Sequence, residues 1–398
     1  MLKDLLKGAG AVAAGTAIGQ GVVLLATPYL ARIYTPAQFG ELALIASISN
    51  IAVATGCLRY DLALPGCRAE DARSLATLCL LSSAGLAVAA MLLPSAVAWL
   101  LGLQLPPPLD LPLLLGLCIL LVGLQQTALG MASRRRAFVH VGAVRFGQGT
   151  GFTALAALPR VGLVWSHALS FIAALPALRA GWRDLPPAGS RLRAVAHSHR
   201  DFPLQSLPGA ILDVVGFSMC LWAVTSAYGK TEAGHFTQIQ RLVGAPLMLV
   251  GLSLGQVLLR HGVDLLDDRP ALRLLMLRIL RHLALFAAVV LLILALVGEP
   301  ILHAVLGGQW RVDSGFVIPI AIAALVRACV SPLSSLLVTL RRFDLGLAWQ
   351  LAYFISAVAL MPWVASHTDI VGFLRFYAVH ECIFYLSYLA LIDRAIRT

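Results

Sequence analysis

Long apolar stretches recur along the whole chain and constrain its fold more than any other feature. Each stretch is roughly 20 residues long, which is the length of α-helix that crosses the hydrocarbon core of a bilayer. Charged residues make up only 12% of the 398 residues, whereas soluble proteins contain about 25%. Because the apolar runs are continuous and do not alternate with polar residues, a transmembrane β-barrel is disfavoured. We therefore predict an all-α, polytopic membrane protein.

Twelve membrane spans can be placed on these stretches, six on either side of a polar segment. The first is predicted to be retained and not cleaved as a signal peptide, because its apolar region is long and interrupted by polar residues. We predict an N-terminal six-helix lobe at residues 1–180, a linker loop at 181–203 and a C-terminal six-helix lobe at 204–398. The Pro-rich stretch LQLPPPLDLP predicts a turn between the third and fourth spans. The predicted spans are 9–31, 38–58, 74–101, 111–132, 138–158, 160–180, 204–228, 234–259, 274–298, 315–340, 345–366 and 370–393.

Basic residues are distributed unevenly between the two sides of this topology. Most of the 30 Lys and Arg residues fall on the side of the two termini and the linker. Three lie inside spans, and four fall on the opposite side: Arg32, Arg160, Lys230 and Arg311. Because cytoplasmic loops carry an excess of Lys and Arg, we predict that both termini and the linker are cytoplasmic. The net charge of +11 then reflects topology, and no nucleic-acid partner is expected.

The sequence lacks the patterns of a catalytic or metal-binding domain. Its seven cysteines have no Cys-x-x-Cys or Cys/His spacing, so we interpret them as small core residues. The segments HSHRD and HEC lack the ligand spacing of a zinc site, and there is no P-loop. The predicted loops are too short for a soluble catalytic domain. We predict a protein that is not an enzyme and that uses neither a metal nor an organic cofactor.

A short motif occurs twice, once in each half. YTPAQFG begins at Tyr34 and YGKTEAG begins at Tyr228, so that Gly40 matches Gly234 at the same offset. Each copy links the first and second predicted spans of a six-span half. Because each half has an even number of spans, the halves are expected to be parallel repeats related by an axis along the membrane normal.

The first copy also contains a strong signal for the start of a helix. Thr35 precedes Pro36, and Gln38 stands three residues after Thr35. This is the pattern of a capping box with proline at the first helical position. We predict that Thr35, Pro36 and Gly40 form a structural hairpin corner that does not bind substrate.

Several segments resemble one family of membrane transporters. They are the corner LARIYTPAQFGELAL, the exit LRYDLAL from the second span, SRRRAFVHVGAVRFGQG entering the fifth, and EAGHFTQIQRLVGAPLMLVGLSLGQVLLR in the second half. The chain is similar to Wzx-type flippases of O-antigen and exopolysaccharide, which belong to the multidrug/oligosaccharidyl-lipid/polysaccharide (MOP) exporter superfamily. The resemblance implies two six-helix lobes around a central cavity, in the bacterial inner membrane.

The resemblance also implies a substrate and partners. The substrate would be an undecaprenyl-diphosphate-linked oligosaccharide, moved from the cytoplasmic to the outer leaflet by alternating access. Membrane lipids would surround the protein. The resemblance leaves open whether a glycan polymerase and a chain-length regulator are also partners. Coupling to H⁺ or Na⁺ is also left open.

A diphosphate crossing the bilayer requires a cationic path, and arginine suits it because its planar fork donates paired hydrogen bonds. Arg241, Arg327 and Arg375 are the basic residues that the topology places inside spans. Arg59 and Arg145 lie nearer the cytoplasmic mouth. We predict these five as substrate-binding candidates; structural ion pairs or snorkelling are the alternatives for each.

Two intramembrane acids are candidates for charge pairing or for ion coupling. They are Asp213 in the seventh span and Glu381 in the twelfth, and pairing with arginine is the favoured interpretation.

Other functions of the protein fit the sequence less well. A small-molecule antiporter of the multidrug type would favour carboxylates over arginines in its spans. A membrane-embedded glycan polymerase or ligase would need a large outer loop, and the intramembrane arginines argue against an inert scaffold.

Overall fold

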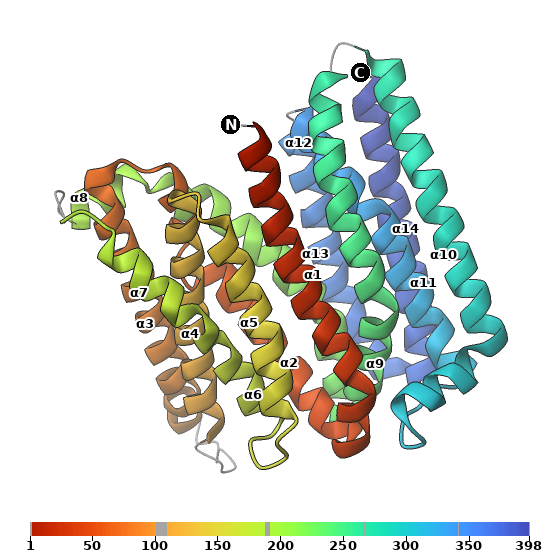
Figure 1. Ribbon diagram of the computed structural model, residues 1–398. Coiled ribbons are helices and arrows are strands. Elements are labelled where there is room, and N and C mark those ends of the chain that lie inside the picture. The colour runs from red at the N-terminus through yellow and green to blue at the C-terminus, as the bar shows by residue number, and fades with distance from the viewer. Residues whose placement is uncertain (1, 101–109, 188–191, 266–267, 341, 398) are drawn as a thin grey trace. The chain divides into compact units, whose positions relative to one another are not determined.

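The computed structural model describes residues 2–100, 110–187, 192–265, 268–340 and 342–397 (Figure 1). All regular structure in these ranges is helical, which confirms the all-α prediction. The α-helices are α1 (Leu2–Ile33), α2 (Pro36–Thr55), α3 (Ala69–Leu100), α4 (Asp110–Arg134), α5 (Phe138–Ala156), α6 (Leu163–Ser170), α7 (Leu175–Arg183), α8 (Leu192–Ser198), α9 (Leu207–Asp264), α10 (Arg269–Leu306), α11 (Ser314–Val330), α12 (Ser335–Thr339), α13 (Phe343–His367) and α14 (Ile370–Arg397). Short 3₁₀ or π turns join several of them: η1 (Tyr60–Leu62), η2 (Leu64–Gly66), η3 (Phe171–Ala174), η4 (Phe202–Ser206) and η5 (Ser331–Ser334).

Ten helical segments of the described residues are long and apolar enough to cross a membrane, as expected of a multi-pass membrane protein. The predicted number of twelve is not confirmed. The predicted fifth span forms α5, which is helical but is not among the ten. The predicted seventh span and the first part of the predicted eighth fall in one helical segment, Phe202–Gly244, which bends at Gly229. Gly229 has φ of 87°, a conformation that glycine adopts without strain.

Two predicted connections can be compared with the structure only in part. The Pro-rich turn falls largely on residues 101–109, which lie outside the described residues. Within the predicted linker 181–203, the structure contains α8, and its Val195 is only 1% exposed. Val195 packs in a cluster with Leu75 and Met131 of α3 and α4. This part of the linker is therefore packed against the helices and is not a free loop.

Packing divides the chain into two compact units. Unit 1 comprises residues 1–30 and 44–214, and unit 2 comprises 31–43 and 215–398. The predicted lobes, 1–180 and 204–398, stay a prediction. The predicted lobes and the two units differ mainly in residues 31–43. These residues hold the hairpin corner and pack with the second half of the sequence.

Unit 1 is built around α4, which contacts α3, α5, α6 and α7 (Figure 1). Small residues set the distance between α1 and α5. A Cβ atom added to Gly15 would collide with the backbone of Gly142, and one added to Gly149 would collide with the backbone of Gly19. The absence of side chains therefore lets these two helix backbones touch, as is common in membranes.

Five of the seven cysteines are buried and all seven are free, in agreement with their predicted role in the core.

In unit 2, α11 packs closely against α10 and α14. Capped helix ends also stabilise this unit. Aspartate side chains accept a hydrogen bond from the first-turn backbone of three helices. Asp268 accepts from the Ala271 amide at 2.9 Å, Asp313 from Phe316 at 3.1 Å and Asp369 from Gly372 at 3.1 Å. Such N-caps each contribute about 1 kcal/mol and fix where the helices begin.

The hairpin corner has the predicted capping box. The Thr35 amide donates to Oε1 of Gln38 at 2.9 Å, and the Gln38 amide donates to Oγ1 of Thr35 at 3.4 Å. Helix α2 begins at Pro36, as the sequence predicts. The cap satisfies amides that have no partner within the helix, and it contributes about 1 kcal/mol.

The two copies of the repeated motif pack against each other within unit 2. A Cβ atom on Gly40 would collide with the carbonyl oxygen of Lys230, and one on Gly234 would collide with that of Pro36. Pro36 and Lys230 are themselves matched by the repeat offset, so the two collisions are equivalent. The contact is therefore reciprocal, as expected where two related segments meet on a pseudo-two-fold axis.

Further contacts hold residues 31–43 against the rest of unit 2. Nζ of Lys230 lies 2.8 Å from Oε1 of Glu41. The Trp310 indole donates to the Ala31 carbonyl at 2.9 Å and packs edge-on against Phe39, with ring centroids 5.2 Å apart. Trp310 is only 3% exposed. The corner is thus packed on several sides, which supports the prediction that its role is structural.

Candidate functional site

An ion pair between Arg327 of α11 and Glu381 of α14 lies inside unit 2. The Arg327 guanidinium donates twice to Oε2 of Glu381, from Nη2 at 2.7 Å and from Nε at 3.1 Å. The Glu381 side chain is fully buried, and that of Arg327 is 17% exposed. Both residues are sequence-predicted candidates, and the structure brings them together. The predicted pairing of an intramembrane acid with an arginine is therefore realised at Glu381.

Tyr353 of α13 completes a closed triangle with this pair. Nη2 of Arg327 donates to the Tyr353 hydroxyl at 2.9 Å, and that hydroxyl donates to Oε1 of Glu381 at 2.7 Å. Each carboxylate oxygen thus receives a strong donor. A buried charge pair is tolerated only when its remaining hydrogen-bonding capacity is also satisfied, and Tyr353 supplies this.

Aromatic rings surround the guanidinium. Its central carbon lies 4.3 Å from the Phe217 ring centroid and 5.4 Å from that of Tyr385. Contacts of this kind add about 0.5–2 kcal/mol each, more when water is excluded. Phe217 belongs to α9, so the arginine joins α9, α11, α13 and α14. The arrangement is typical of an interaction that stabilises the packing of helices.

A second set of hydrogen bonds flanks the ion pair. His380 is 4% exposed, and its Nε2 lies 2.9 Å from the Ser356 hydroxyl. Its Nδ1 lies 3.8 Å from Oε1 of Glu381. On the α9 side, Gln240 donates to the Tyr377 hydroxyl at 3.2 Å. These contacts link three of the same helices, α9, α13 and α14, and leave His380 packed in the core.

Arg241 has a different environment from Arg327. It lies twelve residues after the bend at Gly229, within a candidate membrane span, and its side chain is half-buried. Among the residues that the structure describes, neither an acidic side chain nor a hydrogen-bond acceptor contacts its guanidinium. A cation inside the bilayer without a counter-charge is costly, so Arg241 is available to an anionic ligand.

Unit 1 contains a comparable cation at Arg145. Arg145 lies about two turns into α5 and is half-buried, and in the described part of the chain it too has no acidic partner. Gln148, three residues later, accepts a hydrogen bond from Gln125 of α4 at 2.9 Å. Oε1 of Gln125 and Nε2 of Gln126 are buried, and within the described residues they have no partner. This cluster has spare donors and an acceptor for a polar ligand.

The structure does not gather the remaining predicted residues at the ion pair. Arg59 has a left-handed backbone, with φ of 63°, and its Nε donates to the Ser206 hydroxyl at 3.3 Å. Arg375 is exposed on α14, and the other strongly exposed residues of that face are apolar: Val379, Ile383 and Leu386. This is typical of a lipid-facing side chain that snorkels to the interface. Asp213 is exposed in the α9 segment of unit 1.

Sequence reasoning missed the aromatic surroundings of Arg327. Tyr377, Glu381 and Tyr385 recur every four residues in α14, which places them on one helix face. That spacing was a usable signal. Tyr353 and Phe217 had no such signal, because only tertiary packing brings them to Arg327.

The chain matches the model of one protein family. The match covers residues 29–314, and the family is described as "Polysaccharide biosynthesis protein". A comparison with curated proteins finds no match.

Solved structures with the same fold include transporters and a flippase. "Lipid II flippase MurJ" in its inward closed conformation has a TM-score of 0.72 and 12% identity, with 97% of this chain and 87% of that chain covered. An inward-facing multidrug resistance MATE family transporter of the MOP superfamily has a TM-score of 0.64 and 12% identity, with 97% and 94% covered. The bent form of the Vibrio cholerae MATE transporter VcmN has a TM-score of 0.56 and 15% identity, with 99% and 97% covered.

At these identities the structural likeness establishes the fold, and the family match covers most of the sequence. The chain therefore belongs to the polysaccharide biosynthesis protein family and has the fold of the MOP superfamily.

Proposed function

We propose that this protein is a flippase for an undecaprenyl-diphosphate-linked oligosaccharide, such as an O-antigen or exopolysaccharide repeat unit. Its family belongs to polysaccharide biosynthesis, and one protein of the same fold is described as a lipid II flippase. Arg241 is the observation that carries the proposal. It provides an intramembrane cation that no described side chain neutralises.

The diphosphate group explains why such an arginine would be useful. A diphosphate carries negative charge across the hydrocarbon region, where charges are expensive. The guanidinium donates paired hydrogen bonds that match two phosphate oxygens. In this proposal Arg241 contacts the diphosphate. Arg145, which is also half-buried and has no acidic partner among the described residues, stays a candidate for a polar group of the substrate. Arg327 is given no contact with the diphosphate in this proposal, because Glu381 already holds its guanidinium.

Location and direction are parts of the same proposal. We propose a bacterial inner membrane as the location, with both termini on its cytoplasmic side; the excess of basic residues near the termini supports this orientation. The substrate would then move from the cytoplasmic to the outer leaflet by alternating access through a cationic central cavity. Coupling to H⁺ or Na⁺, and association with a glycan polymerase and a chain-length regulator, stay predictions.

Arg241→Ala is expected to abolish export of surface glycan in a flippase-null strain that depends on this protein. Arg241→Lys keeps the charge but loses the fork, so it is expected to retain part of the export. The measurement is surface glycan normalised to the amount of protein in the membrane. Arg375→Ala, which removes an exposed arginine, serves as the matched control and should export normally.

Full export by Arg241→Ala at normal abundance would remove Arg241 from the mechanism. Restored multidrug efflux without glycan export would instead favour a small-molecule antiporter.

A further inference from the structure

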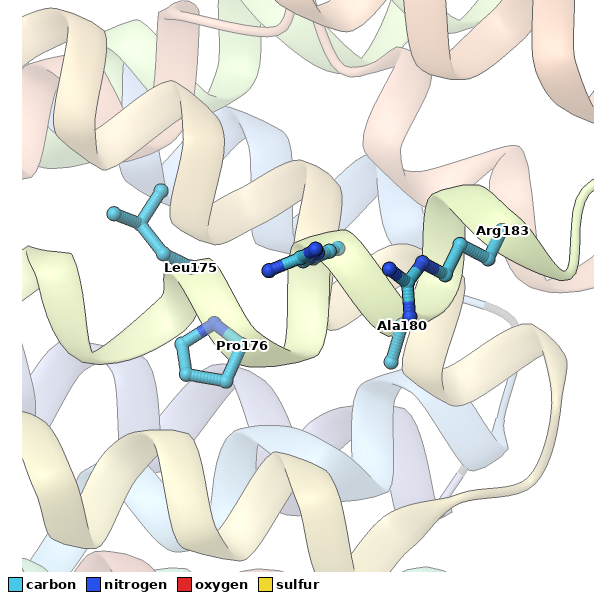
Figure 2. A pocket seen from close by; sticks show the side chains of 5 residues that line it. Leu175, Pro176, Ala180 and Arg183 are labelled. Carbon is cyan, nitrogen blue, oxygen red and sulfur yellow. The ribbon is translucent and has the colours of Figure 1, made fainter.

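A groove runs along α7 at the end of a candidate membrane span. It has a volume of about 530 Å³ and is lined by Leu175, Pro176, Arg179, Ala180 and Arg183. Figure 2 shows that its labelled side chains come from successive turns of the same helix. The candidate span, assigned from length and composition, ends at Arg183, so the cationic end of the groove is expected at the membrane boundary. The volume lies within the range of about 300–1,000 Å³ typical of small-molecule sites.

The two arginines of the groove are exposed and unengaged. Arg179 and Arg183 stand four residues apart and therefore lie on one face of α7. Within the described ranges, neither guanidinium has an ion-pair or hydrogen-bond partner. Like charges at this spacing repel by a few tenths of a kcal/mol. An anion bound between them would remove this repulsion.

Other arginines close to α7 are already engaged. The Arg73 guanidinium lies over the Trp182 ring at 5.7 Å and donates to the Leu185 carbonyl at 3.3 Å. Arg135 forms an ion pair with Asp184. An excess of basic residues on one side of the membrane explains why arginines occur here, but it does not explain why one adjacent pair lines a groove with its donors free.

Apolar surface continues the groove toward the membrane. Leu175 and Ile172 are each 40% exposed, and they lie one to two turns before Arg179. The surface of this short stretch therefore changes from apolar to cationic in the direction of the membrane boundary. An anionic lipid has the same order of groups, since its acyl chains are followed by its phosphate.

We propose that this groove binds an acidic phospholipid, with the phosphodiester between Arg179 and Arg183 and the acyl chains beside Ile172 and Leu175. Charge complementarity selects this occupant, because basic pockets at the membrane boundary of helical proteins recognise anionic headgroups. A zwitterionic lipid would bring a cationic group to the same arginines. The site is separate from Arg241 and does not depend on the proposed transport function.

The test uses the purified, full-length protein in detergent and measures its thermal unfolding while lipid is added. Phosphatidylglycerol is expected to raise the melting temperature of the wild type, whereas phosphatidylcholine and inorganic phosphate are not. In Arg179→Gln/Arg183→Gln the apparent affinity for phosphatidylglycerol should fall by about fivefold for each arginine, which corresponds to about 1 kcal/mol per basic residue. Because both arginines are exposed, this variant is expected to fold.

Two controls decide the outcome. Arg193→Gln/Arg200→Gln removes two exposed arginines outside the groove and should keep the full response. Arg179→Lys/Arg183→Lys should keep part of it. An unchanged response in the glutamine variant, or an equal loss in the Arg193/Arg200 control, would overturn the proposal. An equal shift with phosphatidylcholine would exclude a site selective for acidic lipid, and a full shift with inorganic phosphate would exclude a lipid as the occupant.

Discussion

Replacing Arg327 with methionine is expected to lower the free energy of unfolding by about 3–5 kcal/mol, the usual cost of leaving a buried charge without its partner. Glu381 is fully buried and receives two hydrogen bonds from Arg327. Of the hydrogen bonds described at this carboxylate, the variant would keep the one from the Tyr353 hydroxyl, with His380 3.8 Å away. Thermal unfolding in detergent and the abundance of the protein in the membrane measure the effect.

The double variant Arg327→Met/Glu381→Gln should be more stable than Arg327→Met alone, because no unpaired charge remains. Arg375→Met is the matched control, and its effect should stay within about 0.5 kcal/mol because Arg375 is exposed. Since Glu381 holds Arg327, the double variant is also expected to retain glycan export. If the loss of stability in the double variant equalled the sum of the losses in Arg327→Met and Glu381→Gln, the two residues would not act as a pair.

Replacing Gly40 with alanine is expected to destabilise the protein by about 3 kcal/mol, at the upper end of the usual cost of overpacking. The added Cβ atom would collide with the carbonyl oxygen of Lys230, which is backbone and cannot rotate away. Gly234→Ala should have a similar effect, because its Cβ atom would meet the equivalent oxygen of Pro36. Thermal unfolding of the purified variants provides the comparison.

Gly85→Ala is the matched control for this pair. Gly85 lies in α3, and nothing within 4 Å of it would meet a Cβ atom. Alanine is the better helix former by about 1 kcal/mol, so this variant should be neutral or stabilised. If Gly40→Ala and Gly234→Ala behaved like Gly85→Ala, the close crossing of the two repeat copies would be refuted.

Local features of this fold could be predicted from the sequence because local chemistry determines them. The apolar runs specify helices that suit a bilayer, and Thr35 with Gln38 specifies the start of α2 to the residue. The offset between the repeat copies is also visible in the sequence. That Gly40 and Gly234 contact each other is not visible there, since a repeat identifies equivalent positions without bringing them together.

The candidate site was only partly predictable, for a physical reason. Depth in the membrane identifies Arg327 and Glu381 as residues that need partners, but it does not assign the partners. Asp213 and Glu381 were both compatible with the sequence, and tertiary packing brings Glu381 to Arg327. Breaks within predicted spans were also missed. The predicted sixth span is interrupted at η3, where Pro176 in the first turn of α7 lacks an amide donor.

The central claim is that this protein moves a diphosphate-linked glycan lipid across a bilayer, and translocation by the purified protein tests it most directly. Liposomes containing the protein would receive a fluorescent undecaprenyl-diphosphate-linked oligosaccharide, and the fraction that becomes accessible to an external glycan-cleaving enzyme would be followed over time. Wild-type protein is expected to expose substrate from both leaflets. Arg241→Ala should expose only the outer leaflet, as in protein-free liposomes. Equal exposure with wild-type protein and with protein-free liposomes would contradict the account.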